Sequence, residues 1–173
     1  GVHGLRLNPG NIRNEKQIKE VARECLNANI PIRIGVNAGS LDKDILEKYG
    51  DAVPEALVES ALLEARYLED VDFHDIKISV KHSNVPLMIE SYRLLAETVE
   101  YPLHLGVTEA GPLPGGLIKS IAGISTLLPQ LFELHLHQQQ QALHLCLPQQ
   151  SIFLLLARQQ PCLSHQQLLQ PVL

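Results

Sequence analysis

The feature that most constrains the fold of this chain is a strand pattern followed by a helix pattern, repeated four times. The clearest strand pattern covers residues 31–40, where isoleucine and valine alternate with Arg33. Period-two alternation of β-branched residues is typical of a strand. Three further segments show similar strand patterns: residues 5–11, 75–81 and 102–108. Strands that alternate with helices pair in parallel through helical crossovers, so the pattern predicts an α/β fold.

Helical spacing of apolar residues fills the intervals between these strands. The spacing predicts helices over residues 15–29, 41–49, 54–69, 85–98 and 117–128. Ser40 is placed to cap the second of these helices, and Pro54 suits the first turn of the third.

Two architectures fit parallel strands with helical crossovers: part of an eight-stranded β/α barrel, or an open doubly wound sheet. Polar residues follow every predicted strand, which favours the barrel, because barrel active sites collect loops from many strands. A whole barrel takes about 250 residues. The sequence therefore predicts a partial (β/α)8 TIM-type barrel with parallel strands over residues 1–128.

A partial barrel would also leave apolar inward faces incompletely covered. The residues expected there are Ile32, Ile34, Ile76, Ile78, Leu103 and Leu105. The chain begins within a predicted strand, so we expect it to be a fragment of a longer protein. No signal peptide is recognised before that strand.

The composition changes at Pro129. After it only Glu133 and Arg158 are formally charged, and a glutamine run covers residues 138–141. Biased segments of this kind do not normally fold alone. Residues 129–173 are therefore predicted to be an irregular C-terminal tail and not a native domain. A changed reading frame or a spliced alternative end would each produce such a segment.

Charge and cysteine content exclude several classes of function. The net charge of −5 argues against nucleic-acid binding, which favours a basic face. The three cysteines Cys25, Cys146 and Cys162 are too scattered for a disulfide framework or a metal knuckle, so a reducing compartment is expected. No uninterrupted apolar run suggests a membrane span.

The candidate site consists of polar residues at the carboxyl ends of the predicted strands. Arg6, Arg33 and Lys81 are cations, and Asn37 is an amide beside a glycine turn. Arginine grips phosphate oxygens in bidentate fashion and lysine adds a point charge, which together suit a diphosphate. Glu109 among these cations would be an ionised carboxylate or an acid/base group. Further polar candidates at these ends are Asn8, Asn11, His82, His104 and Thr108.

Each candidate also has a purely structural interpretation when taken singly. Arg6, Arg33 and Lys81 suit solvated surface positions. Asn37 suits a turn, and Glu109 suits the start of a helix, where an acid complements the helix dipole. The functional interpretation depends on their common place at the ends of successive strands.

Four whole segments closely resemble 4-hydroxy-3-methylbut-2-enyl diphosphate synthase, the iron–sulfur enzyme of the methylerythritol phosphate route to isoprenoids. They are Arg6-Leu-Asn-Pro-Gly-Asn11, Pro31-Ile-Arg-Ile-Gly-Val-Asn-Ala-Gly-Ser40, Asp75-Ile-Lys-Ile-Ser-Val-Lys81 and Pro102-Leu-His-Leu-Gly-Val-Thr-Glu-Ala-Gly111. The resemblance runs in register from the start of the chain to about Leu128. It identifies the chain with the central barrel portion of that oxidoreductase.

The resemblance implies a function and a set of partners. The family reductively opens the ring of 2-C-methyl-D-erythritol 2,4-cyclodiphosphate with loss of water, using electrons from ferredoxin or flavodoxin. It implies substrate binding by Arg6, Arg33, Asn37 and Lys81, and a catalytic Glu109 near the reacting carbons. It also implies a homodimer when full length, and a location in the bacterial cytoplasm or in the plastid stroma of a plant or alga.

The chain departs from the family in ways that bear on activity. The family holds a [4Fe–4S] cluster through a Cys-Pro-x-Cys motif and a later cysteine, and these ligands are absent from this sequence. No metal ligands are therefore assigned, and the chain is expected to be inactive alone. Two alternatives stay open: a non-catalytic diphosphate-binding or structural barrel fragment, and a pterin-binding-type β/α barrel enzyme.

Overall fold

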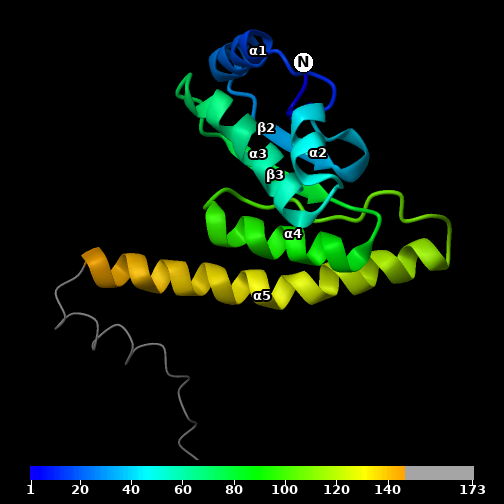
Figure 1. Ribbon diagram of the computed structural model, residues 1–173. Helices are drawn as coiled ribbons and strands as arrows, with labels where there is room; N and C mark the ends of the chain where they lie inside the picture. The colour runs from blue at the N-terminus through cyan, green and yellow to red at the C-terminus, as the bar shows by residue number, and fades with distance from the viewer. Residues whose placement is uncertain (147–173) are drawn as a thin grey trace, which may run out of the picture. The chain divides into compact units, whose positions relative to one another are not determined.

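The computed structural model describes residues 1–146, with side chains described through residue 131. Residues 1–132 form one compact unit. The elements in chain order are β1 (Leu5–Leu7), α1 (Glu15–Ala28), β2 (Ile32–Asn37), the 3-10 turn η1 (Ala38–Ser40), α2 (Lys43–Tyr49), α3 (Pro54–Glu69), β3 (Ile76–Lys81), α4 (Val85–Thr98) and α5 (Gly115–Cys146) (Figure 1).

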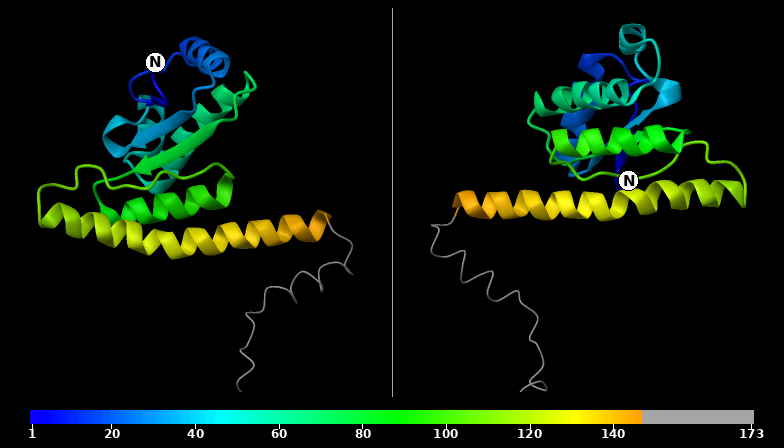
Figure 2. Two further views of the ribbon diagram at one scale, coloured as in Figure 1. Left: turned by 180° about the vertical axis from the view of Figure 1, so that it is seen from behind. Right: turned by 60° about the horizontal axis from the view of Figure 1, so that its bottom comes forward.

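The three strands form one parallel sheet in the order β1-β2-β3. Helix α3 packs against both β2 and β3, and α4 packs against β3. Seen from behind, the strands of the sheet are not covered by helices (Figure 2, left). This parallel sheet with helices on one side confirms the predicted α/β partial barrel.

The core lies between the sheet and these helices. Ile32, Ile34 and Ile78 are fully buried, and Ile76 is nearly so. The expectation that these four isoleucines lie on uncovered inward faces is therefore wrong. Alternation divides a strand into two faces, but the helices cover the isoleucine face and leave the Arg33 face open.

The predicted fourth strand is reduced to one parallel bridge between Ile78 and Leu103. The amide of Ile78 donates to the carbonyl of Pro102 at 2.9 Å, and that of His104 donates to the carbonyl of Ile78 at 2.8 Å. After His104 the segment leaves the regular ladder. The carbonyl of His104 accepts from the hydroxyl of Tyr92 of α4 at 2.7 Å, and the next backbone contact with β3 is from the amide of Thr108 to the carbonyl of His82 at 3.4 Å.

Local capping explains where the helices begin. The side chain of Asn14 accepts hydrogen bonds from the amides of Lys16 and Gln17 at the start of α1. Helix α2 begins at Lys43 and is capped by Asp42, whose carboxylate accepts from the amide of Asp44 at 2.9 Å. Ser40, predicted as this cap, instead donates to the Asn8 side chain.

Helix α5 is longer than the predicted segment of 117–128 and runs through Pro129 to Cys146. The Leu- and Gln-rich sequence after Pro129 consists of good helix formers, which explains a helical backbone in place of the expected irregular structure. The prediction for the rest of the tail falls on residues 147–173, outside the described residues. No helix within residues 1–146 is long and apolar enough to cross a membrane.

The first part of α5 lies alongside α4 (Figures 1 and 2). A Cβ at Gly123 would lie 2.6 Å from Cε of Met88, so any larger residue here would require the Met88 side chain to move. Arg93 of α4 donates to the side chain of Gln130 at 2.8 Å. Leu127 is fully buried and belongs to the hydrophobic core.

Candidate functional site

The uncovered face of the sheet carries a row of three cations. Arg6 of β1 is in register with Arg33 of β2, which is in register with Lys77 of β3. Two residues further along the strands, Gly35 pairs with Ser79, and Asn37 and Lys81 then pair at the carboxyl ends. We call Arg6, Arg33, Lys77 and Lys81 the cationic face.

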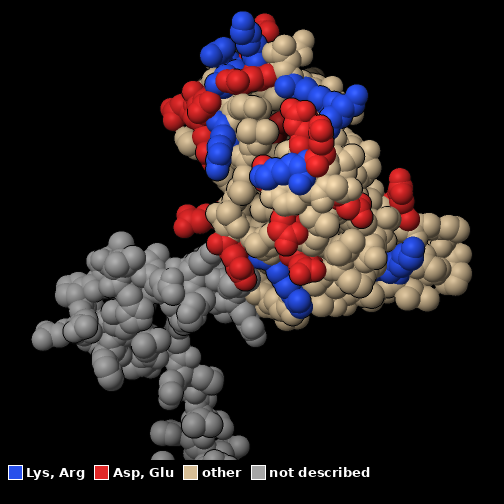
Figure 3. Space-filling model, in the orientation of Figure 1, with Lys and Arg blue, Asp and Glu red and all other residues tan. Residues whose placement is uncertain are grey.

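The cationic face has no acidic partners within the described part of the chain. No carboxylate among residues 1–131 lies within ion-pair distance of its four side chains. On the opposite, helix-bearing side, acidic and basic side chains are interspersed over α1, α2 and α3 (Figure 3). Like charges in register on one sheet face are mutually destabilising, so this face is suited to an anion.

The side chain of Arg6 extends along the sheet toward the carboxyl end of β2. Its Nη2 donates to the carbonyl of Gly35 at 3.2 Å. The Asn37 amide has two possible orientations, and only one of them gives both its nitrogen and its oxygen a partner. In that orientation the nitrogen donates to the carbonyl of Val36 at 3.1 Å, and the oxygen accepts from Arg6 Nη2 at 3.1 Å. Asn37 and Arg6 are therefore joined directly.

The side chain of Arg33 crosses to β3. Its Nη1 donates to the hydroxyl of Ser79 at 2.8 Å, and this hydroxyl donates to the carbonyl of Ile34 at 3.2 Å. Partial burial and the charge of Arg6 lower the pKa of Arg33, which nevertheless remains a cation at any physiological pH. The guanidinium is held in place while its other N–H groups stay available.

Lys81 and His104 lie within electrostatic reach of the arginines. Burial lowers the pKa of Lys81, and the charges of Arg33 and Arg6 lower it further. Burial also lowers the pKa of His104, with added effects of Arg33, Lys81 and Lys77. Desolvation is the larger cause of both pKa shifts, and the smaller charge effects show that these cations lie close enough to repel one another.

Glu109 lies on the loop that follows the predicted fourth strand, directly after Thr108, whose amide donates to the carbonyl of His82 at 3.4 Å. It lies in an exposed bend with φ of 52°, in the left-handed region, and Gly111 follows with φ of 95°. Among the described side chains, no ion pair joins Glu109 to a residue of the cationic face. The structure thus brings Arg6, Arg33, Asn37 and Lys81 to one face, and places Glu109 on a loop near the end of β3 without an ion pair to these residues.

Two polar candidates at the strand ends have structural partners instead. Asn8 is buried, and its side-chain oxygen accepts from the amide of Gly10 at 3.0 Å and from the hydroxyl of Ser40 at 3.1 Å. His82 accepts the amide of Asn84 at 2.8 Å, just before α4. Asn8 therefore fixes the turn after β1 against η1, and His82 supports the start of α4.

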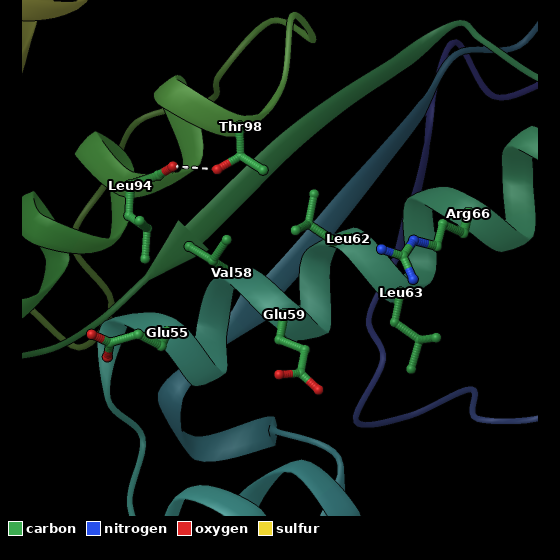
Figure 4. A pocket seen from close by; sticks show the side chains of 8 residues that line it. All are labelled: Glu55, Val58, Glu59, Leu62, Leu63, Arg66, Leu94 and Thr98. Carbon is green, nitrogen blue, oxygen red and sulfur yellow. Dashed lines mark hydrogen bonds between the residues drawn. The ribbon is translucent and has the colours of Figure 1, made fainter.

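The helix side carries a groove of a different character. A cleft of about 460 Å³ lies between α3 and α4 and is lined by Leu62, Leu94 and Thr98 among others (Figure 4). One of its two carboxylates, Glu59, already accepts from Lys48 at 2.7 Å and from Tyr49 at 2.6 Å. The charged groups of this cleft are thus partly neutralised within the protein, in contrast to the cations of the sheet face.

Cys25, the cysteine within the described side chains, does not fit the role of an iron–sulfur cluster ligand. Such clusters are held by several cysteine thiolates. Cys25 is buried on α1, and burial raises the pKa of its thiol, which favours the neutral form. No group of three or more His, Cys, Asp or Glu suited to a metal occurs among the described side chains. Cluster chemistry is therefore assigned to no described residue.

Sequence reasoning misses Gly35, Lys77 and Ser79 as parts of the site. Lys77 and Ser79 alternate with the isoleucines of β3, but the strand pattern alone does not mark them as ligands. The register of β2 with β3 reveals them, because it pairs Arg33 with Lys77 and Gly35 with Ser79. Register depends on long-range pairing and is not visible in a single segment.

A parallel sheet with helices on one side and unpaired cations on the other defines a class: β/α-barrel modules with an anion-suited inner face. A family model described as the GcpE TIM-barrel domain matches residues 1–132. The chain belongs to this family.

Three similar proteins share a name. The 4-hydroxy-3-methylbut-2-en-1-yl diphosphate synthase (flavodoxin) of Clostridium acetobutylicum is 59% identical over 130 residues, which is 75% of this chain and 37% of the relative. The proteins of the same name from Corynebacterium diphtheriae and Acidithiobacillus ferrooxidans are 60% identical over 131 residues and 57% identical over 128 residues. They are matched over 34% and 35% of their lengths, with 75% and 74% of this chain. The chain therefore spans about a third of the length of the relatives it matches.

Proposed function

We propose that this chain is the substrate-holding barrel portion of a 4-hydroxy-3-methylbut-2-enyl diphosphate synthase. The full-length enzyme would open the ring of 2-C-methyl-D-erythritol 2,4-cyclodiphosphate reductively, with loss of water. Family membership and the names of the relatives support this reaction. The observation that carries the binding role is the cationic face, whose four cations have no carboxylate partner among the described residues.

In this proposal the diphosphate lies against the carboxyl-end half of the cationic face. Arg6 and Arg33 present guanidinium N–H groups to phosphate oxygens, and Lys81 adds a point charge. Asn37 holds Arg6 through the contact described above and offers its amide beside it. These four residues bind and orient the substrate.

Glu109 takes the acid/base role near the reacting carbons. Its loop lies next to the carboxyl end of β3, because the amide of the preceding Thr108 donates to the carbonyl of His82 at 3.4 Å.

The remaining partners are proposed for the full-length protein. We propose flavodoxin as the electron donor, in keeping with the relatives' names, with ferredoxin as the alternative donor. A [4Fe–4S] cluster would be held by residues outside the described part of this chain, in a homodimer. The location would be the cytoplasm of a bacterium, or the plastid stroma if the source is a plant or alga.

Titration of the 173-residue chain with inorganic pyrophosphate, followed by calorimetry, tests the binding role. Arg33→Ala is expected to weaken binding by roughly ten- to a hundredfold, because a charge-assisted contact is lost. Arg23→Ala is the matched control, since Arg23 is an exposed arginine on α1. Equal losses in both variants, or no binding by the unmodified chain, would contradict the proposal.

The other two functions are less well supported. A pterin-binding enzyme does not agree with relatives that are 57–60% identical and carry the synthase name. A purely structural fragment leaves the unpaired cationic face without an explanation. We expect the 173-residue chain by itself to bind pyrophosphate without turning over the cyclodiphosphate, which an assay with reduced flavodoxin would check.

A further inference from the structure

Two small residues separate the cationic row from the carboxyl ends of the strands. Gly35 of β2 and Ser79 of β3 are in register with each other, on the uncovered face. Both are buried, although this face has no helix over it. Beside them lie the two long side chains from the row before, Arg6 and Arg33.

Gly35 leaves the space that the Arg6 guanidinium occupies. A Cβ at this position would lie 3.2 Å from Cζ and 3.3 Å from Cδ of Arg6, and closer still to its Nε. The carbonyl of Gly35 accepts from Arg6 Nη2 at 3.2 Å. Any side chain at residue 35 would therefore push the guanidinium off the sheet and away from Asn37.

Ser79 sets the direction of the Arg33 guanidinium. Its hydroxyl accepts from Nη1 of Arg33 at 2.8 Å and donates to the carbonyl of Ile34 at 3.2 Å. Because both hydrogen bonds are made, the buried hydroxyl is satisfied and its orientation is fixed. An aliphatic residue here would leave the guanidinium without its acceptor.

We propose that Gly35 and Ser79 are positioning residues that set the reach and orientation of Arg6 and Arg33 for a diphosphate. Neither contacts the anion; each acts through one arginine. The inference rests on the proposed function, because the arginines are taken as the diphosphate ligands. The inference further states that these two small residues make the site bind a diphosphate more tightly than an anion the size of one phosphate.

The first test removes the Ser79 hydroxyl. Ser79→Ala is expected to weaken pyrophosphate binding by about tenfold, because one fixed contact of Arg33 loses its orientation. Sulfate binding should change much less, so the ratio of the two affinities falls. Ser79→Thr, which keeps a hydroxyl, should restore most of the ratio. Ser91→Ala is the matched control: Ser91 is equally buried, but its hydroxyl donates to the carbonyl of Leu87 within α4.

The second test uses Gly35→Ala in a double-mutant cycle with Arg6→Ala. Gly35→Ala alone should weaken pyrophosphate binding by about tenfold, and should have no further effect once Arg6 is alanine. Gly4→Ala is the control, because a Cβ there makes only ordinary contacts at 3.8 Å and beyond. The two tests are independent, so misfolding of one variant leaves the other to decide.

The outcomes separate this inference from the function on which it rests. An unmodified chain that binds no pyrophosphate overturns the proposed function and the inference together. An unmodified chain that binds, with Ser79→Ala and Gly35→Ala matching their controls, overturns the inference alone. Additive losses in the Gly35 and Arg6 cycle would also overturn it, because the glycine would then act independently of the arginine.

Discussion

At the scale of single residues, two buried polar side chains of α3 stand out. Ser60 and Glu64 lie one helical turn apart, and among the described residues Ser60 Oγ and Glu64 Oε1 have no hydrogen-bond partner. Burial raises the pKa of Glu64 from 4.5 to about 7. A protonated carboxyl costs less to bury than a carboxylate, and the raised pKa keeps a larger fraction of Glu64 protonated than at an exposed position.

This shift predicts a pH dependence of stability. Because the pKa of Glu64 is raised in the folded state, the folded protein holds the proton more tightly, and stability falls as pH rises from about 4.5 to about 7. The loss attributable to Glu64 is at most roughly 3 kcal/mol. Glu64→Gln should flatten this slope in urea unfolding curves measured between about pH 5 and 8.

The exposed Glu47 on α2 supplies the control. Glu47→Gln should leave the slope as it is in the unmodified chain. A Glu64→Gln variant with the full slope would show that other groups cause the pH dependence.

At the scale of strands and helices, most elements are predictable because their signals are local. Helices α3 and α4 begin and end where apolar spacing predicts, and β2 and β3 begin within a residue of the predicted strands. The fourth strand is reduced to the bridge between Ile78 and Leu103, because a local strand pattern does not determine whether the segment pairs along its whole length. The choice of Asp42 over Ser40 as a cap depends on the Asn8 contact, which is non-local.

The start of α1 offers a test of local stabilisation. Asn14→Ala should lower the free energy of unfolding by about 1 kcal/mol, because the amides of Lys16 and Gln17 lose their acceptor. Asn14→Ser should keep most of the stability. Chemical denaturation of both variants measures the difference.

Asn27→Ala, at an exposed position within the same helix, controls for loss of an asparagine. It should be neutral or slightly stabilising, since alanine is the better helix former. Equal destabilisation by both substitutions would show that the Asn14 cap contributes little.

The candidate site is predictable only in part. The sequence places Arg6, Arg33, Asn37 and Lys81 at strand ends, and parallel pairing then puts them on one face. Their neighbours Gly35 and Ser79 carry no sequence signal of their own, because glycine and serine become informative only once an arginine lies beside them. Glu109 is the opposite case: the sequence singles it out, but its position in a loop cannot be predicted because no strand register fixes it.

At the scale of the whole molecule, the unit of residues 1–132 exposes surfaces suited to association. Within the described residues β1 pairs only with β2, and a largely apolar groove of about 660 Å³ is lined in part by Val2, Leu5 and Val21. Ile118, Ile121 and Leu128 of α5 are each more than half exposed. We therefore expect this unit to self-associate through its open sheet edge and its apolar helix face, since the isoleucines of the sheet are buried.

Ile121→Lys is expected to reduce self-association without lowering the thermal unfolding temperature, because this side chain is 57% exposed. Light scattering across a concentration series measures the first effect, and calorimetry measures the second. Thr126→Lys adds the same charge to an exposed polar position of α5 and should change association less. Equal effects of the two lysines would show that net charge, and not the apolar face, governs association.

The row of Arg6, Arg33 and Lys77 has a practical consequence at the bench. Three like charges in register oppose the pairing of the very strands that carry them. An anion that binds the folded sheet and not the unfolded chain raises stability by mass action, by about 2.7 kcal/mol at a hundred times its dissociation constant. Phosphate and sulfate in purification or storage buffers would then act as unnoticed ligands. Unfolding temperatures measured in phosphate and in Tris would disagree, and the difference would report on occupancy of the sheet.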